Sequence, residues 1–381
     1  MPQVLVYAPY SFSGRGPAES CARIAGGMVA SGVRPVVFAG RRRTPLPEGV
    51  AVRLPFVGMT GLLPWRGAVE TVALARLEQQ FRRALTRCDP RTTVAHFWPG
   101  TPTRLVEATH EAGVTTVREM VNSALATAGP ILDEAYARLG LPATHGITAS
   151  AIADETHELT RYDYVFASNP EVETSLRALG VSDDRILATT FGWLPERYAG
   201  ADPAERDARF RAVFVGRIGV RKGIPELLDG WSRTDVDGEL VLVGSVDPEI
   251  ADLVEERVRG GRVRLWGYAQ NPGALYASSD VFVFPTLEEG GPQVTYEAAG
   301  FGLPVVTTPM GAARLVEDGR TGLVVPPASP ERIAAALQSL ADDPERCGSL
   351  GSAAAAAAES FSYDKVGASR AQLLRAVLAD R

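Results

Sequence analysis

The sequence predicts two α/β domains, each built on a doubly wound parallel sheet. Three observations lead to this fold class. The 381 residues exceed the usual size of a single domain. Short apolar runs alternate with longer helical patterns along the chain. The alternation stops near 194–204, where proline, glycine, alanine and charged residues cluster, and then starts again, so we place a linker over 196–204.

The first half opens with an apolar run over 4–8, a helical pattern over 17–31 and a second apolar run over 35–39, which together make a β-α-β unit. Strands joined in this way by helices form a parallel sheet. A mainly helical, loop-rich insert over 121–160 interrupts the rhythm. The other elements expected in this half are helices over 68–87, 103–112 and 171–179 and strands over 93–97, 114–118 and 164–168.

The second half repeats the alternation at shorter spacing. It starts with a buried strand over 212–215 and a helix over 223–231. The further elements expected here are strands over 239–243, 262–266, 281–284 and 304–307, and helices over 248–258, 272–277, 293–299, 330–341 and 362–378. The alanine run 353–358 is strongly helical, and we expect it at the surface. Two open sheets of this kind place a ligand crevice at the carboxyl ends of their strands.

Composition narrows the classes of protein to consider. With 45% hydrophobic and 22% charged residues, the chain can bury a core and need not be disordered. With a net charge of −6, the chain has no overall positive potential that would attract nucleic acid. The three cysteines show no paired spacing, and the longest apolar runs are far shorter than a membrane helix. No leader pattern opens the chain, so we expect a cytoplasmic protein without a transmembrane segment.

Charge is uneven along the chain. Residues 1–100 hold 13 arginines and only 5 acidic residues. The run 41–43, followed by Arg53 and Arg66, is compatible with an anionic acceptor site, with contact to an anionic membrane surface, or with a plain solvated face.

Residues 214–223 run from a strand through a glycine-containing turn into a helix. Such a turn lets the backbone approach a phosphate, and the helix N-terminus favours negative charge. Arg217 and Lys222 add two mobile cations, so the segment suits a diphosphate. Lys222 and Lys365 are the only lysines among the 39 basic residues, which suggests that a compact point charge is needed at 222.

Residues 284–297 form a second turn of this kind, again between a strand and a helix. Glu289 and Glu297 lie eight positions apart, and carboxylates accept hydrogen bonds from vicinal hydroxyls. The backbone amides of Gly290 and Gly291 suit a sugar or phosphate oxygen. Pro292 has no N–H to offer.

Together the two segments resemble the donor-binding half of family 4 retaining glycosyltransferases, which have the GT-B fold. The family's Gly-Arg…Lys-Gly diphosphate site matches 216–223, its Glu-x7-Glu signature matches 289–297, and its Gly-Leu-Pro-Val-Val strand matches 302–306. The resemblance covers 212–375 through specific motifs and 1–195 through the order of elements alone. It implies two facing Rossmann-like domains.

The resemblance also implies roles in the second domain. Arg217 and Lys222 neutralise the diphosphate of a nucleotide sugar, and Glu289 contacts the donor sugar near the reacting carbon; these three are the expected catalytic residues. Glu297 holds the ribose hydroxyls. The remaining expected donor-binding residues of this domain are Gly216, Gly290 and Gly291. Neither a metal nor a cofactor is expected, and the anomeric configuration is retained.

In the first domain, the resemblance points to the loop 13–17, where Gly14 and Gly16 border the diphosphate and the transferred sugar. The family often places a histidine at a strand end, as His96 is placed, and another close to Arg118 and Glu119, where this sequence has none. The candidates for the sugar or acceptor side are therefore Arg15, His96, Arg118, Glu119 and Asn122. A structural, hydrogen-bonded His96 is equally compatible with the sequence.

The resemblance also implies a role for each domain. Residues 1–195 are expected to bind the acceptor, 205–360 the nucleotide sugar, and 361–381 to form a helix that crosses back to the first domain. Acceptor specificity is expected in the insert 121–160 and in the loop 58–65, because loops on a rigid scaffold carry recognition. The arginine and alanine content suggests a bacterial source, in which a glycan, a lipid or a specialised metabolite is a plausible acceptor.

Three other functions are compatible with parts of the sequence. A nucleotide-sugar epimerase of the same fold would convert its sugar nucleotide without an acceptor. A catalytically silent partner subunit would bind the sugar nucleotide without turnover. An NAD-dependent enzyme is disfavoured, because Glu19 stands where the Gly-x-Gly-x-x-Gly pattern beginning at Gly14 needs its third glycine.

Overall fold

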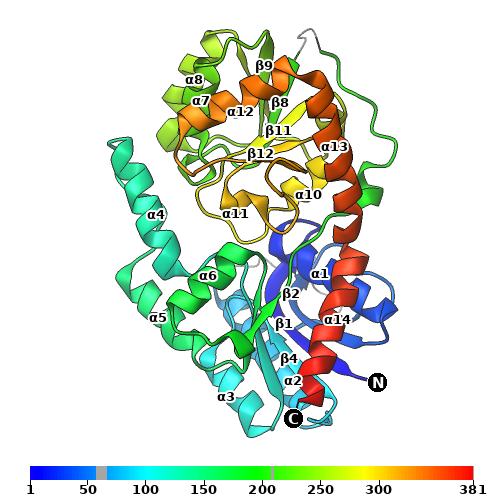
Figure 1. Ribbon diagram of the computed structural model, residues 1–381. Helices are drawn as coiled ribbons and strands as arrows, with labels where there is room; N and C mark the ends of the chain where they lie inside the picture. The colour runs from blue at the N-terminus through cyan, green and yellow to red at the C-terminus, as the bar shows by residue number, and fades with distance from the viewer. Residues whose placement is uncertain (57–66, 207–209, 381) are drawn as a thin grey trace.

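The computed structural model describes residues 1–56, 67–206 and 210–380. Two parallel sheets organise it, one in each half of the molecule (Figure 1). The first has seven strands in the order β3-β2-β1-β4-β5-β6-β7, and the second has six in the order β10-β9-β8-β11-β12-β13. Every paired strand is parallel to its neighbours. The predicted fold class, two doubly wound α/β sheets with helices around them, is confirmed.

The predicted elements of the first half occur in the predicted order, with the insert formed by α4 and α5, and two short edge strands, β3 and β7, that the sequence did not predict complete the sheet. The strands are β1 (Gln3–Phe12), β2 (Arg34–Arg42), β3 (Ala51–Arg53), β4 (Thr93–Phe97), β5 (Thr115–Glu119), β6 (Tyr164–Ala167) and β7 (Ile186–Ala188). The helices are α1 (Gly16–Ala30), α2 (Ala68–Leu85), α3 (Thr103–Glu111), α4 (Leu125–Arg138), α5 (Ala149–Leu159) and α6 (Pro170–Ala178).

The second half repeats the pattern, and its last two helices extend towards the first sheet. The strands are β8 (Phe210–Val215), β9 (Gly238–Val243), β10 (Val263–Gly267), β11 (Val281–Phe284), β12 (Val305–Thr307) and β13 (Gly322–Val324). The helices are α7 (Ile224–Ser232), α8 (Ala251–Arg259), α9 (Gly273–Ala277), α10 (Gln293–Gly300), α11 (Pro309–Ala312), α12 (Pro330–Asp342), α13 (Pro344–Ala358) and α14 (Tyr363–Ala379).

The burial of the central strands explains why they appear in the sequence as short apolar runs. All residues of β4, β8 and β11 are buried, since helices cover both faces of each sheet. The strand order reverses between β1 and β4 in the first sheet and between β8 and β11 in the second. Ligands of such sheets bind outside the carboxyl ends of the strands at these reversals.

The chain returns from the second half to the first through its last two helices. Backbone hydrogen bonds of 3.0 and 3.1 Å join Trp193 to Phe361 and Tyr363, where α13 gives way to α14. Helix α14 then runs beside α1 of the first half (Figure 1). In the described parts of the chain, no helix combines the length and hydropathy needed to cross a membrane. The loop 58–65, predicted to influence acceptor choice, lies outside the described residues.

Candidate functional site

The two predicted phosphate and sugar segments lie next to each other at the carboxyl edge of the second sheet. Residues 216–223 follow β8, and residues 285–292 follow its neighbour β11. Gly223 has a left-handed φ of 67°, and a Cβ at this position would lie 2.1 Å from the carbonyl oxygen of Pro285. Glycine is therefore required for this approach, which brings the end of the first segment against the second.

Lys222 is held between Glu289 and Phe284. Its ammonium group forms an ion pair with the Glu289 carboxylate and lies 5.4 Å from the centroid of the Phe284 ring. Burial lowers the pKa of Lys222, although Glu289 opposes this effect. Burial alone would raise the pKa of Glu289, but Lys222 and Arg221 outweigh it and lower that pKa. The site therefore holds a desolvated cation that a bound anion can share with one carboxylate.

Arg217 lies on the same edge but faces solvent. Its side chain is 70% exposed and forms an ion pair with Asp247, which follows β9. Arg217 and Lys222 line the same cavity, so the structure brings together the two cations that the sequence assigned to a diphosphate.

A second ion pair, between Arg221 and Glu288, lies beside Lys222 within the second half, and each of its two residues also contacts the first half. Glu288 is only 2% exposed and lies 2.8 Å from the Arg221 guanidinium. Its other oxygen accepts hydrogen bonds from the backbone N–H and the hydroxyl of Ser123, at 3.0 and 2.9 Å. Arg221 in turn donates to the side-chain oxygen of Asn122 at 3.0 Å. These four residues form a ring of polar contacts that we call the cross-domain ring.

Of the four members of this ring, only Asn122 was a candidate from the sequence. Arg221 and Glu288 adjoin Lys222 and Glu289 in the chain, which is the one signal that points to them. The ring itself brings together three segments far apart in the chain, since 99 residues separate Asn122 from Arg221 and 165 separate Ser123 from Glu288.

A cavity of about 510 Å³ opens beside these residues, beneath the insert. One wall is largely apolar and comes from the insert: Leu125, Ala128, Leu132, Tyr136 and Ile147. The facing wall is charged and comes from the second half: Arg217, Arg221, Lys222, Asp247, Glu249 and Glu288. A cavity with one apolar and one charged wall suits a substrate that is itself amphipathic.

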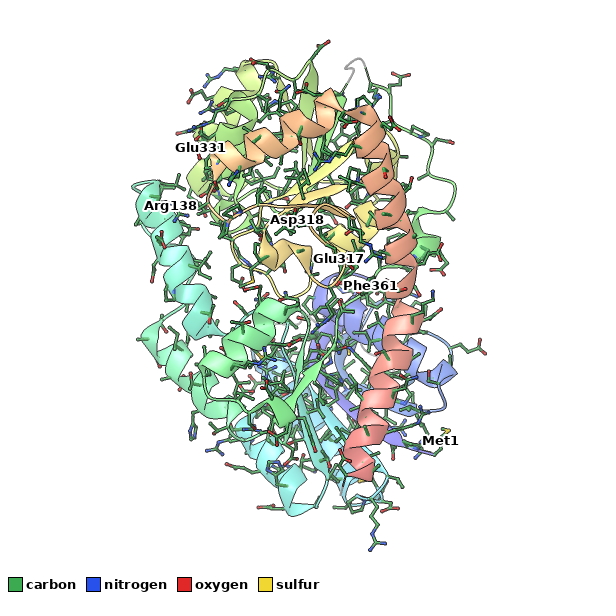
Figure 2. The ribbon with its side chains drawn as sticks, in the orientation of Figure 1. Met1, Arg138, Glu317, Asp318, Glu331 and Phe361 are labelled. Atoms are coloured by element: carbon green, nitrogen blue, oxygen red, sulfur yellow. The ribbon has the colours of Figure 1, made fainter. Side chains whose placement is uncertain are left out.

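Helix α4 carries the apolar wall and reaches across to the second half. The Tyr136 hydroxyl donates to Glu249 at 2.7 Å, and Arg138 lies 3.4 Å from Glu226. Figure 2 labels Arg138 near the end of this helix. His145, which the sequence gave no functional role, also lines the cavity and is hydrogen-bonded to Asp133 at 2.9 Å.

Glu297 does not line the cavity that Arg217 and Lys222 share. It projects from α10, is 7% exposed, and accepts a 3.3 Å hydrogen bond from Tyr276. Burial raises its pKa, although Tyr198, Arg197 and Tyr276 oppose the shift. Arg197 is also part of the wall of a second cavity, which has a volume of about 870 Å³.

This second cavity lies between the two halves of the chain. Gly14, Arg15 and Gly16 line one side, and Tyr268, Gln270 and Asn271, which follow β10, line the other. The guanidinium of Arg15 lies 5.6 Å from the centroid of the Tyr268 ring. The glycine loop therefore faces the strand-end loops of the second half, although in a different cavity from Arg217 and Lys222.

Gly290 and Gly291 pack directly on the first half. A Cβ at Gly290 would lie 2.0 Å from the Val121 carbonyl oxygen, and one at Gly291 would lie 1.9 Å from the Phe191 ring. The Gly290 carbonyl accepts hydrogen bonds from Ser168 at 2.7 Å and Asn169 at 2.6 Å. In this arrangement the loop serves as a contact between the halves.

Comparison with known proteins shows what this arrangement resembles. Residues 209–343 match the family model described as glycosyl transferases group 1. The D-inositol 3-phosphate glycosyltransferase of Paenarthrobacter aurescens is 32% identical over 184 residues, which cover 43% of this chain and 43% of that protein. The capsular polysaccharide biosynthesis glycosyltransferase CapM of Staphylococcus aureus is 32% identical over 139 residues, covering 34% and 36% respectively. The alignments thus span less than half the length of these curated relatives.

Residues 209–343 belong to the group 1 glycosyl transferases. Solved structures extend the likeness in fold to the whole chain. Sucrose-phosphate synthase from Thermosynechococcus elongatus superposes with a TM-score of 0.74 at 20% identity, and Anabaena HepE, in complex with UDP and glucose, with 0.68 at 17%; both matches cover all of each chain. The GT-B fold expected from the resemblance is confirmed.

The remaining candidates of the first half form an internal network. His96 and Glu119 are at most 2% exposed and lie 2.8 Å apart. Glu119 also forms an ion pair with buried Arg370 of α14. Arg118, 5% exposed, lies 3.1 Å from Glu158 of α5. None of His96, Arg118 and Glu119 lines either cavity described above, so of the first-half side chains proposed for the sugar or acceptor side, Asn122 and Arg15 are the two that do.

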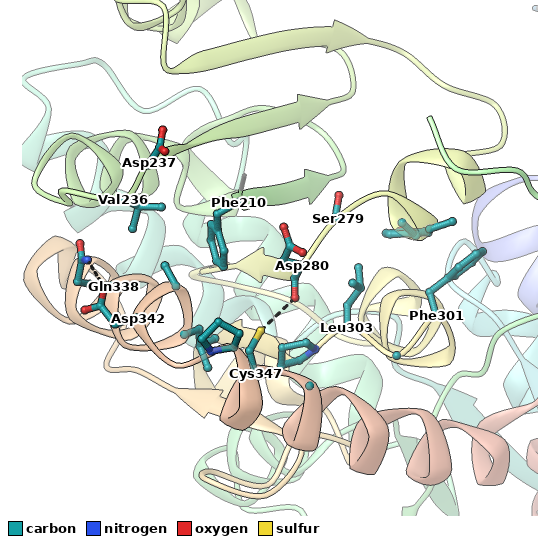
Figure 3. A pocket seen from close by; sticks show the side chains of 18 of the residues that line it. Phe210, Val236, Asp237, Ser279, Asp280, Phe301, Leu303, Gln338, Asp342 and Cys347 are labelled. Carbon is teal, nitrogen blue, oxygen red and sulfur yellow. Dashed lines mark hydrogen bonds between the residues drawn. The ribbon is translucent and has the colours of Figure 1, made fainter. Parts of the chain in front are cut away.

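A further cavity of about 670 Å³ lies elsewhere on the glycosyl transferase domain (Figure 3). The Cys347 thiol donates to the Asp280 carbonyl at 3.4 Å within it, and Gln338 donates to Asp342 at 2.9 Å. It contains none of the predicted site residues. Among residues 1–56, 67–206 and 210–380, no three His, Cys, Asp or Glu side chains gather as a metal site would require.

Proposed function

We propose that this protein transfers a sugar from a nucleoside diphosphate sugar to an acceptor hydroxyl, with retention of the anomeric configuration. The supporting observation is that Arg217 and Lys222 line one cavity at the carboxyl edge of the second sheet, each beside a carboxylate. A diphosphate bound at this point becomes the counter-ion of the two cations. It either takes the place of the two carboxylates or shares the cations with them. The family of residues 209–343 supports the same activity.

The chemistry follows from where charge develops. As the bond between the sugar carbon and the diphosphate oxygen breaks, its electron pair passes to the diphosphate. The two cations stabilise this negative charge more strongly than water does, because Lys222 is already desolvated. The acceptor oxygen forms the new bond on the same face of the sugar, and its proton passes to the departing diphosphate oxygen. These cations provide the charge stabilisation, and in our proposal no metal is needed.

The donor's nucleoside end belongs, in this proposal, to the cavity of about 870 Å³ bordered by Gly14, Gly16 and Tyr268, so the two glycines border the nucleoside rather than the diphosphate and sugar expected from the sequence. Arg197 connects this cavity to Glu297, whose carboxylate we assign to the ribose hydroxyls. Glu289 lies beside Lys222 and is therefore placed to contact the sugar next to the diphosphate.

The acceptor, in this proposal, enters beneath α4. The cavity of about 510 Å³ borders Lys222 and offers an apolar wall from the insert. An acceptor with an apolar portion beside its reacting hydroxyl buries that portion against Leu132 and Ile147.

Lys222→Ala tests the proposal. We expect turnover to fall at least ~100-fold, because one of two cations on the leaving group is lost, while the protein still folds. Lys365→Ala removes the only other lysine, which is exposed on α14, and is the matched control. Wild-type turnover in the Lys222 variant would refute the assignment.

Ligand binding provides the second measurement. Thermal shifts with UDP, GDP, ADP and dTDP sugars identify the donor, since a ligand at about 100 times its Kd adds about 2.7 kcal/mol of stability. The Lys222 variant should lose most of that shift and the Lys365 variant none of it. Conversion of the donor without any acceptor would instead favour an epimerase, and binding without turnover a silent subunit.

A further inference from the structure

A groove on the first sheet gathers four arginines far from the donor site. Its volume is about 490 Å³, and the residues that line it are Gln3, Leu5, Arg34, Val36, Phe38, Ala51, Arg53, Gln80, Arg83, Ala84, Arg87 and Cys88. No carboxylate is among them. We call this the arginine groove. It lies between strands β1 to β3 and helix α2, towards the amino-terminal ends of β1 and β2.

The register of the strands explains how two of the arginines meet. Gln3 of β1 pairs with Arg34 of β2, and Phe38 of β2 pairs with Arg53 of β3. Since alternate residues of a strand face the same side, Arg34 and Phe38 of β2 face the same side of the sheet, and their partner Arg53 lies on it too. Leu5 and Phe38, which also line the groove, are buried, whereas Arg34 and Arg53 are exposed.

Helix α2 contributes the other two arginines. Gln80, Arg83 and Arg87 are spaced by three and four residues, which places them in one row along the helix. That row lines the groove beside the apolar face of α2, which is buried at Leu77, Phe81 and Leu85, and Arg83 and Arg87 remain exposed there. The sequence and the fold thus direct cations from two separate elements to one place.

These arginines have no acidic partner within the described residues. Arg82, the neighbour of Arg83, forms an ion pair with Glu78, whereas Arg34, Arg53, Arg83 and Arg87 form none. Like charges that share a groove repel one another, and a bound anion removes this repulsion. The arrangement therefore favours a ligand with several negative charges.

Gln80 provides an independent indication of a ligand. Its amide nitrogen donates to the Leu54 carbonyl at 3.0 Å, while its side-chain oxygen is buried without a hydrogen-bond partner. A buried acceptor without a donor is costly, and a ligand hydroxyl supplies that donor once the Gln80 side chain turns its oxygen into the groove that it lines.

We propose that the arginine groove binds a phosphate-bearing polyanion with a hydroxyl group, such as a phosphorylated sugar or polyol. Guanidinium groups bind phosphate with paired, charge-assisted hydrogen bonds, and four of them match two phosphate groups. The site is distinct from the donor site: it lies towards the amino ends of the strands, whereas Arg217 and Lys222 lie at the carboxyl ends of the other sheet. Figure 1 shows α2 at the end of the molecule away from that sheet.

Calorimetric titration with inorganic pyrophosphate tests the proposal on three variants that each lose two positive charges. The groove variant carries Arg83→Gln and Arg87→Gln, the donor variant Arg217→Gln and Lys222→Gln, and the control variant Arg332→Gln and Arg346→Gln, two exposed arginines of the second half. We expect two pyrophosphate sites in the wild type and in the control variant.

The groove variant should weaken one of these sites at least ~10-fold, and the donor variant the other. A groove variant that binds pyrophosphate as the wild type does would overturn the inference. A donor variant that does so would overturn the proposed function alone, so the two failures are distinguishable.

Vesicle sedimentation then identifies the source of the phosphate. We expect no binding to vesicles of phosphatidylglycerol in phosphatidylcholine beyond that to phosphatidylcholine alone, because a groove fits a single soluble ligand better than a flat surface. Binding to the anionic vesicles that the groove variant loses would show that the phosphate belongs to a lipid headgroup.

Discussion

His96 shows how a single residue gains a structural role through its surroundings. It ends strand β4, where the sequence made it a candidate for the sugar side, but its ring is 2% exposed and bonded to Glu119. Burial lowers the pKa of His96, and Glu119 only partly opposes the shift. Burial alone would raise the pKa of Glu119, but Arg370 and His96 lower it. The folded protein therefore holds a neutral imidazole beside an ionised carboxylate that Arg370 neutralises.

This arrangement predicts a pH-dependent stability. The unfolded chain takes up a proton at His96 near pH 6.5, whereas the folded chain does so only at lower pH. The contribution of His96 to stability is therefore complete above about pH 6.5 and is lost as the pH falls below it. His96→Gln, which retains a hydrogen-bond donor for Glu119, should lose less stability than the wild type between about pH 7.5 and pH 5.5.

Denaturant unfolding at the two pH values measures this difference. His157→Gln, at an exposed histidine of α5, is the matched control for the loss of a histidine. If the His96 variant showed the same pH dependence as the wild type, the neutral state of His96 in the fold would be wrong.

At the scale of elements, the crossing of α1 and α14 connects the C-terminal helix to the first sheet. A Cβ at Gly27 would lie 2.6 Å from the Tyr363 carbonyl oxygen, and one at Gly367 would lie 2.6 Å from the Gly27 Cα. Each helix has a glycine at the crossing, so the two backbones are in contact. Side-chain packing around the crossing includes Ala22, Leu374 and Val366.

The crossing predicts opposite effects for two glycine substitutions in neighbouring helices. Gly367→Ala should destabilise the protein by about 1–3 kcal/mol, because the methyl group has no room. Gly348→Ala in α13 meets nothing within 4 Å and should stabilise it by about 0.5–1 kcal/mol, as alanine ordinarily does in a helix. Chemical denaturation of both variants checks the pair. A stabilising Gly367→Ala would mean that the helices do not pack this closely.

The alanine run 353–358 shows that tertiary packing decides which face of a helix is buried. The sequence places 353–358 at the surface, and this is wrong for one face of the helix. Ala354 and Ala358 are fully buried, because α13 packs on the second half. Trp193 also donates from its indole N–H to the Ala358 carbonyl at 2.9 Å. Uniform alanine carries no periodic signal, so the sequence could not reveal which face is inward.

On the scale of the whole molecule, the loop at 288–293 joins the two halves. Glu288 accepts from Ser123, the Gly290 carbonyl accepts from Ser168 and Asn169, and Gln293 donates to Ser20 at 2.9 Å. The segment that we assign to the donor sugar is therefore bonded directly to the half that we assign to the acceptor. Closure of the molecule and the geometry of the donor site depend on the same contacts.

Glu288→Ala is expected to loosen this closure. It removes two hydrogen bonds from Ser123 and the ion pair with Arg221, all in a buried position. Small-angle scattering should show a larger radius of gyration than in the wild type, and a bound nucleoside diphosphate should reduce it in both. Glu331→Ala, which removes an exposed ion pair within the second half, is the control. Equal radii in the wild type and the Glu288 variant would show that the ring does not hold the halves together.

The sequence by itself determined the two parallel sheets, their order of elements and the segments that hold Arg217, Lys222, Glu289 and Glu297. These features are local: apolar runs, helical periodicity and glycine turns express the energies of neighbouring residues in the chain. Lys222 and Glu289 form an ion pair because the strands that precede their loops, β8 and β11, are neighbours in the sheet.

The tertiary structure alone decided which residues share a cavity. It leaves Glu297 out of the cavity that Lys222 lines, and it encloses His96 and Glu119 with Arg370. It also brings Ser123 to Glu288, and Arg83 and Arg53 to one groove. Such contacts join residues far apart in the chain. Their energy depends on burial and on partners that come together only once both halves of the molecule have packed, so no local pattern in the sequence encodes them.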